Sequence, residues 1–145
     1  MPNGKELDLS QGSVLHIKGF STRGHPPKNK YCLVLGVEQH SSVLVFLISS
    51  QQKYREHPSF RDELVTVLKG AVHFLPQESF IQCFTLEKLD KEKLDDGYSR
   101  GLVDHKGKLG MKYLYKIRDA VKNSKLLTQQ EVQSVLEILN LPKST

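Results

Sequence analysis

The sequence has no tryptophan, only two cysteines and no long hydrophobic run. A helix that spans a bilayer needs about 20 consecutive, mostly apolar residues, whereas the longest apolar run here, residues 43–48, has the length of a strand. Residues 1–11 carry charges where a secretory signal would be apolar. Two cysteines also cannot build the disulfide framework of a small secreted protein. Together these features predict a cytoplasmic protein that does not enter a membrane.

The cysteines and histidines do not have the spacing of a metal site. Cys32 and Cys83 are each flanked by apolar or aromatic residues, so we expect both to be buried as small hydrophobic side chains. The six histidines are scattered, with no CxxC or HExxH pattern. The sequence therefore predicts no metal and no other cofactor.

Length and charge set the outer limits on fold and partner. The 145 residues are most simply one domain, and 38% hydrophobic with 26% charged residues is an ordinary globular composition. The formal net charge is +5. This excess of positive charge permits nucleic acid or another polyanion as a partner without requiring one.

The first part of the chain is rich in strand patterns. Residues 31–37 and 43–48 are near-continuous apolar runs, typical of central strands with both faces covered. Further strands are predicted at residues 13–18, 64–68 and 79–84, a hairpin turn at 38–42 and a long polar loop at 51–62. Several short strands with no helix between them indicate a small antiparallel barrel, so the fold is expected to be mainly β.

From residue 110 the apolar spacing becomes that of helices. Apolar residues recur at three- and four-residue steps over residues 110–124, which predicts an amphipathic helix. A second C-terminal helix is predicted over residues 128–140, because Thr128 and Glu131 have the spacing of a capping box.

The predicted single domain, residues 1–145, therefore has a barrel core at residues 12–85 and two C-terminal helices. Residues 86–109 lie between them and are dense in mixed charge. We expect a short helical turn or an irregular connection there, with a solvated surface.

A cationic loop precedes the first central strand. Residues 19–30 contain no carboxylate and four groups suited to an anion: Arg23, His25, Lys28 and Lys30. Such groups on a loop held by a rigid strand favour an anionic ligand, and a histidine can exchange protons near neutral pH. A solvated surface loop is the alternative interpretation.

The order of these segments resembles the MazF/PemK family of toxins from type II toxin–antitoxin modules, which includes the Kid toxin. The resemblance covers roughly residues 12–122 and is carried by five segments: Gly12-Ser13-Val14, Thr22-Arg23-Gly24-His25, Lys30 with the apolar run that follows it, Ile48-Ser49-Ser50-Gln51, and the late strand at residues 79–90. The helix from Thr128 onward looks like an added element.

This resemblance implies a fold, a chemistry and partners. Members of the family are SH3-like barrels that form homodimers and cleave single-stranded RNA without a metal. The 2′-hydroxyl attacks the adjacent phosphate, so the protein supplies only a base, an acid and cationic support for the phosphorane. A cognate antitoxin protein normally occupies the RNA groove and mimics its negative charge.

The resemblance assigns catalysis to His25, Lys30 and Ser49. His25 stands where some members place a catalytic histidine. Lys30 replaces the family's catalytic arginine, which keeps the charge but loses the planar fork that grips two phosphate oxygens. Ser49 replaces the usual threonine and keeps a hydroxyl group.

RNA contacts are predicted for a wider set of residues: Arg23, Lys28, Ser50, Gln51, Lys53, Gln82 and Phe84. Gln82 and Phe84 stand where some members place an arginine and an aspartate two residues apart. Gln82 can form hydrogen bonds but cannot act as an acid. Phe84 could stack on a base, and a ring in the barrel core is the alternative.

Two alternatives to an RNA-cleaving toxin stay open. A relative that has lost catalysis would bind RNA or a partner protein through the same groove. A barrel without a nucleic-acid role would instead dock a protein through its C-terminal helices. Salt-dependent RNA binding would exclude the latter, because phosphate contacts weaken with added salt, and a cleavage assay would decide between the other two.

Overall fold

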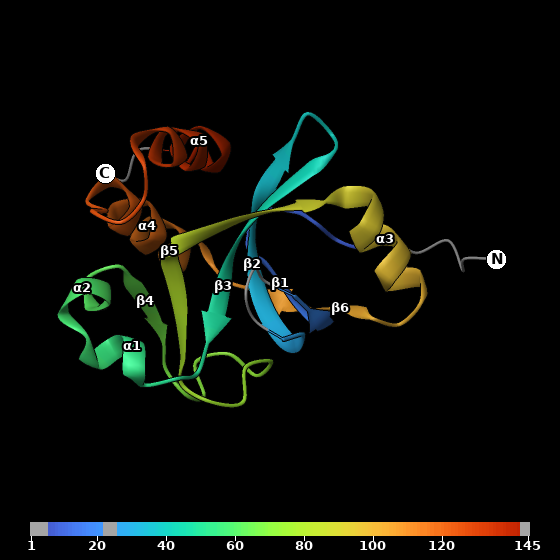
Figure 1. Cartoon of the computed structure of the whole chain (residues 1–145), viewed down its shortest axis with the longest axis horizontal. Coiled ribbons are helices and arrows are strands. Elements are labelled where there is room, and N and C mark those ends of the chain that lie inside the picture. Colours follow the sequence, from blue (N-terminus) through green and yellow to red (C-terminus); the bar gives the residue numbers. More distant parts are fainter. Residues whose placement is uncertain (1–5, 22–25, 143–145) are drawn as a thin grey trace.

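The structure is a computed structural model that describes residues 6–21 and 26–142. Within these residues, six strands form one antiparallel sheet that curls into a half-barrel (Figure 1). The strands are β1 (Ser13–Phe20), β2 (Lys28–Glu38), β3 (Ser42–Ser49), β4 (Leu64–Val67), β5 (Ser79–Asp90) and β6 (Val103–Lys108). Their order across the sheet is β4-β5-β3-β2-β1-β6, so β4 and β6 are its two edges.

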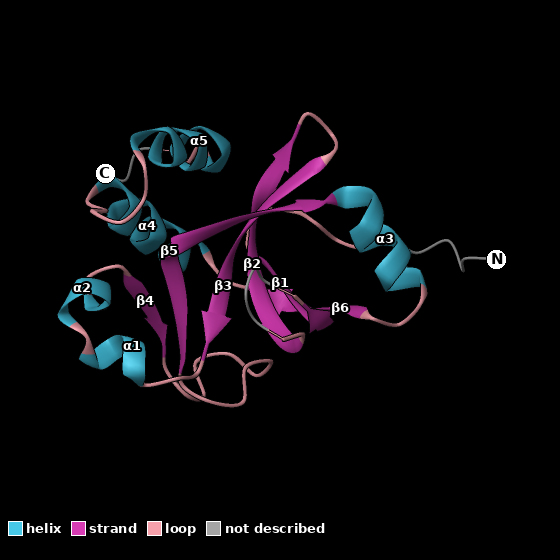
Figure 2. Ribbon diagram, in the orientation of Figure 1, coloured by secondary structure: helices cyan, strands magenta, loops and turns pink. Residues whose placement is uncertain are grey.

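Helices lie on opposite sides of this sheet (Figure 2). They are α1 (Lys53–Glu56), α2 (Pro58–Arg61), α3 (Lys91–Ser99), α4 (Met111–Lys122) and α5 (Gln129–Leu139). The two C-terminal helices, α4 and α5, pack beside each other, and α3 lies at the other end of the molecule (Figure 1). The mainly β fold with C-terminal helices confirms the predicted class in outline. In the described part of the chain, no helix is both long and apolar enough to cross a membrane.

The central strands are covered on both faces, as their continuous apolar runs predicted. Side chains alternate along each strand and divide into two cores. One core contains Leu33 and Phe46 and packs against α4 and α5. The other contains Val34 and Val45 and packs against Leu94 of α3. All four of these strand residues are 0% exposed.

The β4–β5 loop closes the open side of the half-barrel. The edge strands β4 and β6 do not pair with each other. Instead, Phe74 from the loop lies against Gly107 of β6, where an added Cβ atom would be 2.4 Å from Cδ2 of the ring. The next residue, Leu75, is buried at 3% exposure within the first core. Residues 68–78 therefore reach from one edge of the sheet to the other.

The helix α5 is fixed to the sheet through a close approach to β2. A Cβ atom at Gly36 would lie 2.5 Å from Cγ1 of Ile138, so only glycine lets the helix come this near. Gln11 adds hydrogen bonds from its Nε2 to the carbonyl of Leu139 at 3.0 Å and to that of Ile138 at 3.3 Å.

The predicted capping box begins this helix. The hydroxyl of Thr128 accepts a hydrogen bond from the amide of Glu131 at 3.1 Å, and the Glu131 carboxylate accepts one from the amide of Thr128 at 2.9 Å. This confirms the predicted capping box. Each side chain accepts a hydrogen bond from a backbone amide at the beginning of the helix that has no partner within the helix.

Two segments differ from the sequence-based expectation. Residues 86–109, expected to be a short helical turn or an irregular connection, contain the helix α3 but also the end of β5 and the strand β6. Residues 51–62, expected to be a loop, contain the short helices α1 and α2. Pairing decides the first case: β5 follows β3 as far as the Asp90–Ser42 pair, although its later residues are largely charged. A tertiary partner thus overrides a weak local strand pattern.

Both cysteines are buried, as their apolar flanks predicted. Burial raises the pKa of the Cys32 thiol to about 12, and it also raises the pKa of Cys83, with the nearby Glu63 carboxylate adding to the effect. Both side chains therefore stay protonated near neutral pH and pack as apolar groups.

Candidate functional site

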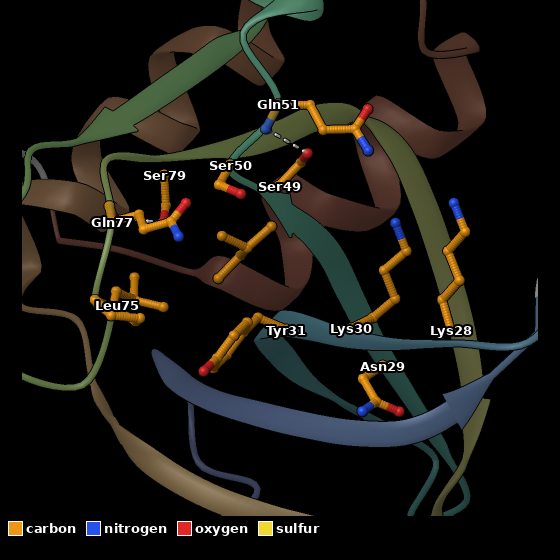
Figure 3. A pocket seen from close by; sticks show the side chains of 12 residues that line it. Lys28, Asn29, Lys30, Tyr31, Ser49, Ser50, Gln51, Leu75, Gln77 and Ser79 are labelled. Atoms are coloured by element: carbon orange, nitrogen blue, oxygen red, sulfur yellow. Dashed lines mark hydrogen bonds between the residues drawn. The ribbon is translucent and has the colours of Figure 1, made fainter.

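A cavity of about 290 Å³ opens where the beginning of β2 meets the end of β3 (Figure 3). We call it the β2–β3 cavity. Its lining comes from residues 28–31 of β2, residues 48–51 at the end of β3, and residues 75–77 and 79 around the beginning of β5.

The strand register brings the first two segments together. Tyr31 of β2 pairs with Ile48 of β3, so Lys30 and Ser49 are the next residues outward on the two strands. Lys28 follows one strand repeat beyond Lys30. The β2–β3 ladder thus sets lysines on one strand near hydroxyl groups at the end of the other.

The lining of the β2–β3 cavity is cationic. It contains Lys28, which is exposed, and Lys30, which is half-buried, and none of the described residues that line it is an Asp or Glu. Within residues 6–21 and 26–142, neither lysine forms an ion pair. The carboxylate nearest in sequence to the lining, Glu78, pairs with Arg55 at 3.4 Å. The two ammonium groups therefore have donors left for a ligand.

Hydrogen bonds orient the hydroxyl groups of the lining. The Oγ atom of Ser49 accepts a hydrogen bond from the amide of Gln51 at 3.0 Å. Ser79 donates from its Oγ to the carbonyl of Gln77 at 2.9 Å (Figure 3). Because the Ser49 oxygen is an acceptor in this contact, its own proton remains available to donate to a ligand.

This arrangement suits an anion with several oxygens. Ammonium groups attract a phosphate by charge, while serine hydroxyl and glutamine amide groups donate directional hydrogen bonds. The site residues predicted from the sequence that line the cavity are Lys28, Lys30, Ser49, Ser50 and Gln51.

Other predicted residues have different positions. Arg23 and His25 lie outside the described residues. Lys53 begins α1, and its side chain is also outside the description. Gln82 and Phe84 do not line the β2–β3 cavity.

The reason is the position of β5 inside the sheet. Gln82 is only 6% exposed because it pairs with Leu64 of the neighbouring strand β4. The ring of Phe84 is half-buried against Phe60 of α2, with 4.9 Å between ring centroids. Gln82 and Phe84, for which RNA contacts were predicted, are therefore not among the lining residues, and other residues form the second wall of the cavity.

That wall contains Leu75, Pro76 and Gln77 from the β4–β5 loop, together with Tyr31 of β2. Sequence reasoning missed the loop residues because they reach the site through the contact of Phe74 with Gly107, far away along the chain. For Tyr31 the signal in the sequence is its position directly after Lys30, at the beginning of the apolar run.

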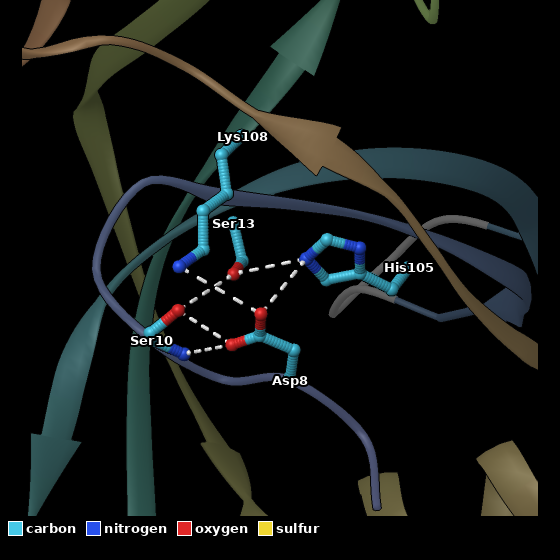
Figure 4. Close-up of polar contacts among 5 residues, drawn as sticks. All are labelled: Asp8, Ser10, Ser13, His105 and Lys108. Atoms are coloured by element: carbon cyan, nitrogen blue, oxygen red, sulfur yellow. Dashed lines mark hydrogen bonds and ion pairs between the residues drawn. The ribbon is translucent and has the colours of Figure 1, made fainter. Parts of the chain in front are cut away.

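A second polar cluster lies between the segment that leads into β1 and the strand β6 (Figure 4). His105 Nε2 is 3.1 Å from Ser13 Oγ and 3.7 Å from an Asp8 oxygen, and Lys108 also approaches this carboxylate at 3.7 Å. Hydrogen bonds from Ser10 lower the pKa of Asp8, with smaller contributions from Lys108 and His105. Among the described residues, no group of His, Cys, Asp and Glu is arranged to hold a metal ion.

This cluster is built to hold the chain rather than to catalyse. Ser13 is 0% exposed, and both Ser13 and Asp8 approach the same ring nitrogen of His105. In a catalytic triad the acid would instead approach the other nitrogen and the serine would be open to substrate. The contacts therefore tie the segment before β1 to β6.

Comparison with protein-family models and with curated proteins finds no match to this chain. The resemblance to MazF/PemK toxins thus stays a prediction that rests on the quoted segments.

Proposed function

We propose that the protein is an SH3-like barrel of the MazF/PemK type that binds single-stranded RNA in the β2–β3 cavity and cleaves it by attack of a 2′-hydroxyl on the adjacent phosphate. The observation that carries this proposal is the convergence of Lys28, Lys30 and Ser49 on one cavity whose described lining residues include no carboxylate. Cleavage itself rests on the family resemblance.

Phosphate binding follows from the chemistry of the lining. The ammonium groups of Lys28 and Lys30 neutralise a backbone phosphate, and the Ser49 hydroxyl donates to one of its oxygens. The phosphorane formed during cleavage carries more negative charge than the diester. The same cations and donors therefore stabilise the transition state more than the substrate, which is the condition for catalysis.

Proton transfer is assigned to His25, which lies outside the described residues. A histidine near its usual pKa can remove the proton of the 2′-hydroxyl. Lys30 and Ser49 then support the charged phosphorane. The bond between phosphorus and the 5′-oxygen breaks, and this oxygen takes up a proton from water as it leaves, which gives a 2′,3′-cyclic phosphate and a 5′-hydroxyl. The proposal also includes a homodimer and a cognate antitoxin, whose acidic segment would compete with RNA for the two lysines.

The binding half is tested by titrating labelled single-stranded RNA at several salt concentrations. We compare wild type with the double variant Lys28→Ala/Lys30→Ala. A matched control, Lys93→Ala/Lys122→Ala, removes the same charge from exposed positions on α3 and α4. Each lost phosphate contact lowers the salt slope by roughly 0.7, so the first variant should lose affinity and slope while the control keeps both. Equal behaviour of the two variants would overturn the site.

The catalytic half is tested with mixed-sequence single-stranded RNA, a chelator and protein free of antitoxin. We expect products ending in a cyclic phosphate, no cleavage at a 2′-deoxy position, and no activity in His25→Ala. An absence of cleavage by the wild type would overturn the proposed endoribonuclease activity. If binding at Lys28 and Lys30 then persisted, the result would identify a non-catalytic RNA-binding relative.

A further inference from the structure

The β2–β3 cavity has two chemically different sides. Lys28, Lys30 and Ser49 form a polar side, whereas Tyr31, Ile48 and Leu75 form an apolar side. Figure 3 shows Tyr31 extending toward Leu75 while both lysines extend away from it. A phosphate alone would use only the polar side.

The divergence of Lys30 and Tyr31 follows from strand geometry. Successive residues of a strand point to opposite faces of the sheet, and both residues lie in β2 near its beginning. A ligand that contacts both must carry a charged group and an apolar surface at separate positions. A nucleotide has this construction, with a phosphate and a flat base joined through a sugar.

The ring of Tyr31 has a partner on each neighbouring strand. In the β1–β2 register Tyr31 pairs with His16, and the two ring centroids are 4.7 Å apart with 56° between the ring planes. On the other side, Tyr31 pairs with Ile48 of β3, which is 4% exposed. The tyrosine itself is only half-buried and lines the cavity.

The loop wall facing this ring is also fixed. Leu75 is 3% exposed, and the residue before it, Phe74, lies on Gly107 of β6. An aromatic ring held by packed neighbours loses little conformational entropy when a base stacks on it. The apolar side is therefore a preformed surface of suitable chemistry for a base.

We propose that Tyr31 is a base-stacking residue: the cavity binds one nucleotide of single-stranded RNA, with its phosphate at Lys28 and Lys30 and its base on Tyr31. This inference rests on the proposed function and adds a base subsite to the phosphate site. It makes RNA with bases a better ligand than a backbone without them, whichever base is present, because every base offers a flat face.

The test compares two oligoribonucleotides of equal length and charge, one ordinary and one with abasic sugars at its central positions. Wild type should bind the ordinary strand about 5- to 150-fold more tightly, the range expected for one stacked base. Tyr31→Ala should lose this preference and bind both strands as wild type binds the abasic one. Tyr31→Phe should keep the preference, since the ring carries the effect.

Two further variants separate the possible failures. Tyr31→Leu retains an apolar side chain in the cavity lining. It therefore shows whether the lost preference in Tyr31→Ala comes from the missing ring or from disturbed folding. Lys28→Ala/Lys30→Ala should weaken both strands by the same factor. If wild type bound neither strand, the proposed function would fail. If wild type bound both equally, or if Tyr31→Leu kept the full preference, the stacking inference alone would be overturned.

Discussion

The ring of Phe74 lies so close to Gly107 that a Cβ atom there would be within 2.4 Å of Cδ2 and 2.5 Å of Cε2. This contact joins the β4–β5 loop to the far edge strand, β6. The residues that follow Phe74 form one wall of the β2–β3 cavity. The shape of the candidate site therefore depends on a contact outside the cavity lining.

Gly107→Ala should destabilise the protein by about 1–3 kcal/mol, the usual cost of forcing atoms into a packed region. The substitution would otherwise be mildly stabilising, because alanine restricts the unfolded chain. The clash with the Phe74 ring outweighs this gain, so the free energy of unfolding should fall. Urea unfolding monitored by circular dichroism measures the change.

Gly110→Ser serves as the control for this change. Apart from its two neighbours in sequence, no described residue comes within 4 Å of a Cβ atom added at Gly110, which precedes α4 as its N-cap with a φ of −74°. Serine is also a preferred N-cap residue, so stability should change by only a few tenths of a kcal/mol. If the Gly107→Ala protein were as stable as wild type, this would contradict the close packing of the Phe74 ring against Gly107.

Glu63 is a buried carboxylate that holds the connection between α4 and α5. It is 4% exposed and accepts hydrogen bonds from the Ser124 hydroxyl and from the amides of Lys125 and Leu126. Glu63→Ala would leave these donors without their acceptor, at a cost of roughly 3 kcal/mol in the free energy of unfolding. Glu137→Ala, at an exposed position of α5, should stay within about 0.5 kcal/mol of wild type. Urea unfolding measures both variants. An equal loss in the free energy of unfolding would contradict the stabilising role of the Glu63 hydrogen bonds.

Local patterns in the sequence predicted the elements whose own residues decide their structure. The apolar runs of β2 and β3, the stripe of α4 and the Thr128–Glu131 capping box all depend on neighbours in sequence. The later half of β5 and the strand β6 were missed, because they form by pairing with β3 and β1. A charged segment becomes a strand there through a distant partner.

The candidate site divides in the same way. Lys28 and Lys30 could be predicted as anion-binding residues from the cationic segment that leads into β2, whereas Ser49 was placed at the site by the resemblance. Leu75 could not be predicted, since its position depends on how the β4–β5 loop crosses the half-barrel. Gln82 was placed at the site by the resemblance, but alternation alone could not show that β4 would pair beside it.

His16 should make the stability of the protein depend on pH. Burial is the main cause that lowers the pKa of His16 below its ordinary value of 6.5; Lys106 and Lys18 act in the same direction, and Asp104 opposes them. Below pH 6.5 the unfolded chain therefore binds a proton more readily than the folded chain does. Stability is fully present above that pH and falls as the pH drops toward the folded-state pKa.

His16→Gln should remove this contribution. We expect the urea midpoint of the wild type to fall more between pH 7.5 and 5 than the midpoint of the variant does. Every other residue is common to both proteins, so the difference between the two curves isolates His16. Parallel curves, or a wild type that gains stability relative to the variant on acidification, would contradict the stated direction.

Lys30→Arg should strengthen RNA binding without changing its salt dependence. Lysine offers one ammonium group, whereas the planar guanidinium of arginine can donate two parallel hydrogen bonds to a phosphate. An additional hydrogen bond is worth about 1 kcal/mol, or roughly a fivefold gain in affinity. Because the charge is unchanged, the salt slope should stay the same, while Lys30→Gln should lower it by roughly 0.7.

Fluorescence anisotropy with labelled single-stranded RNA measures both the affinity and the salt slope, and Lys93→Arg on α3 should bind like wild type. An equal gain at both positions would show a general preference of RNA for arginine, and a loss at Lys30→Arg would show that the β2–β3 cavity is shaped for the slimmer ammonium group.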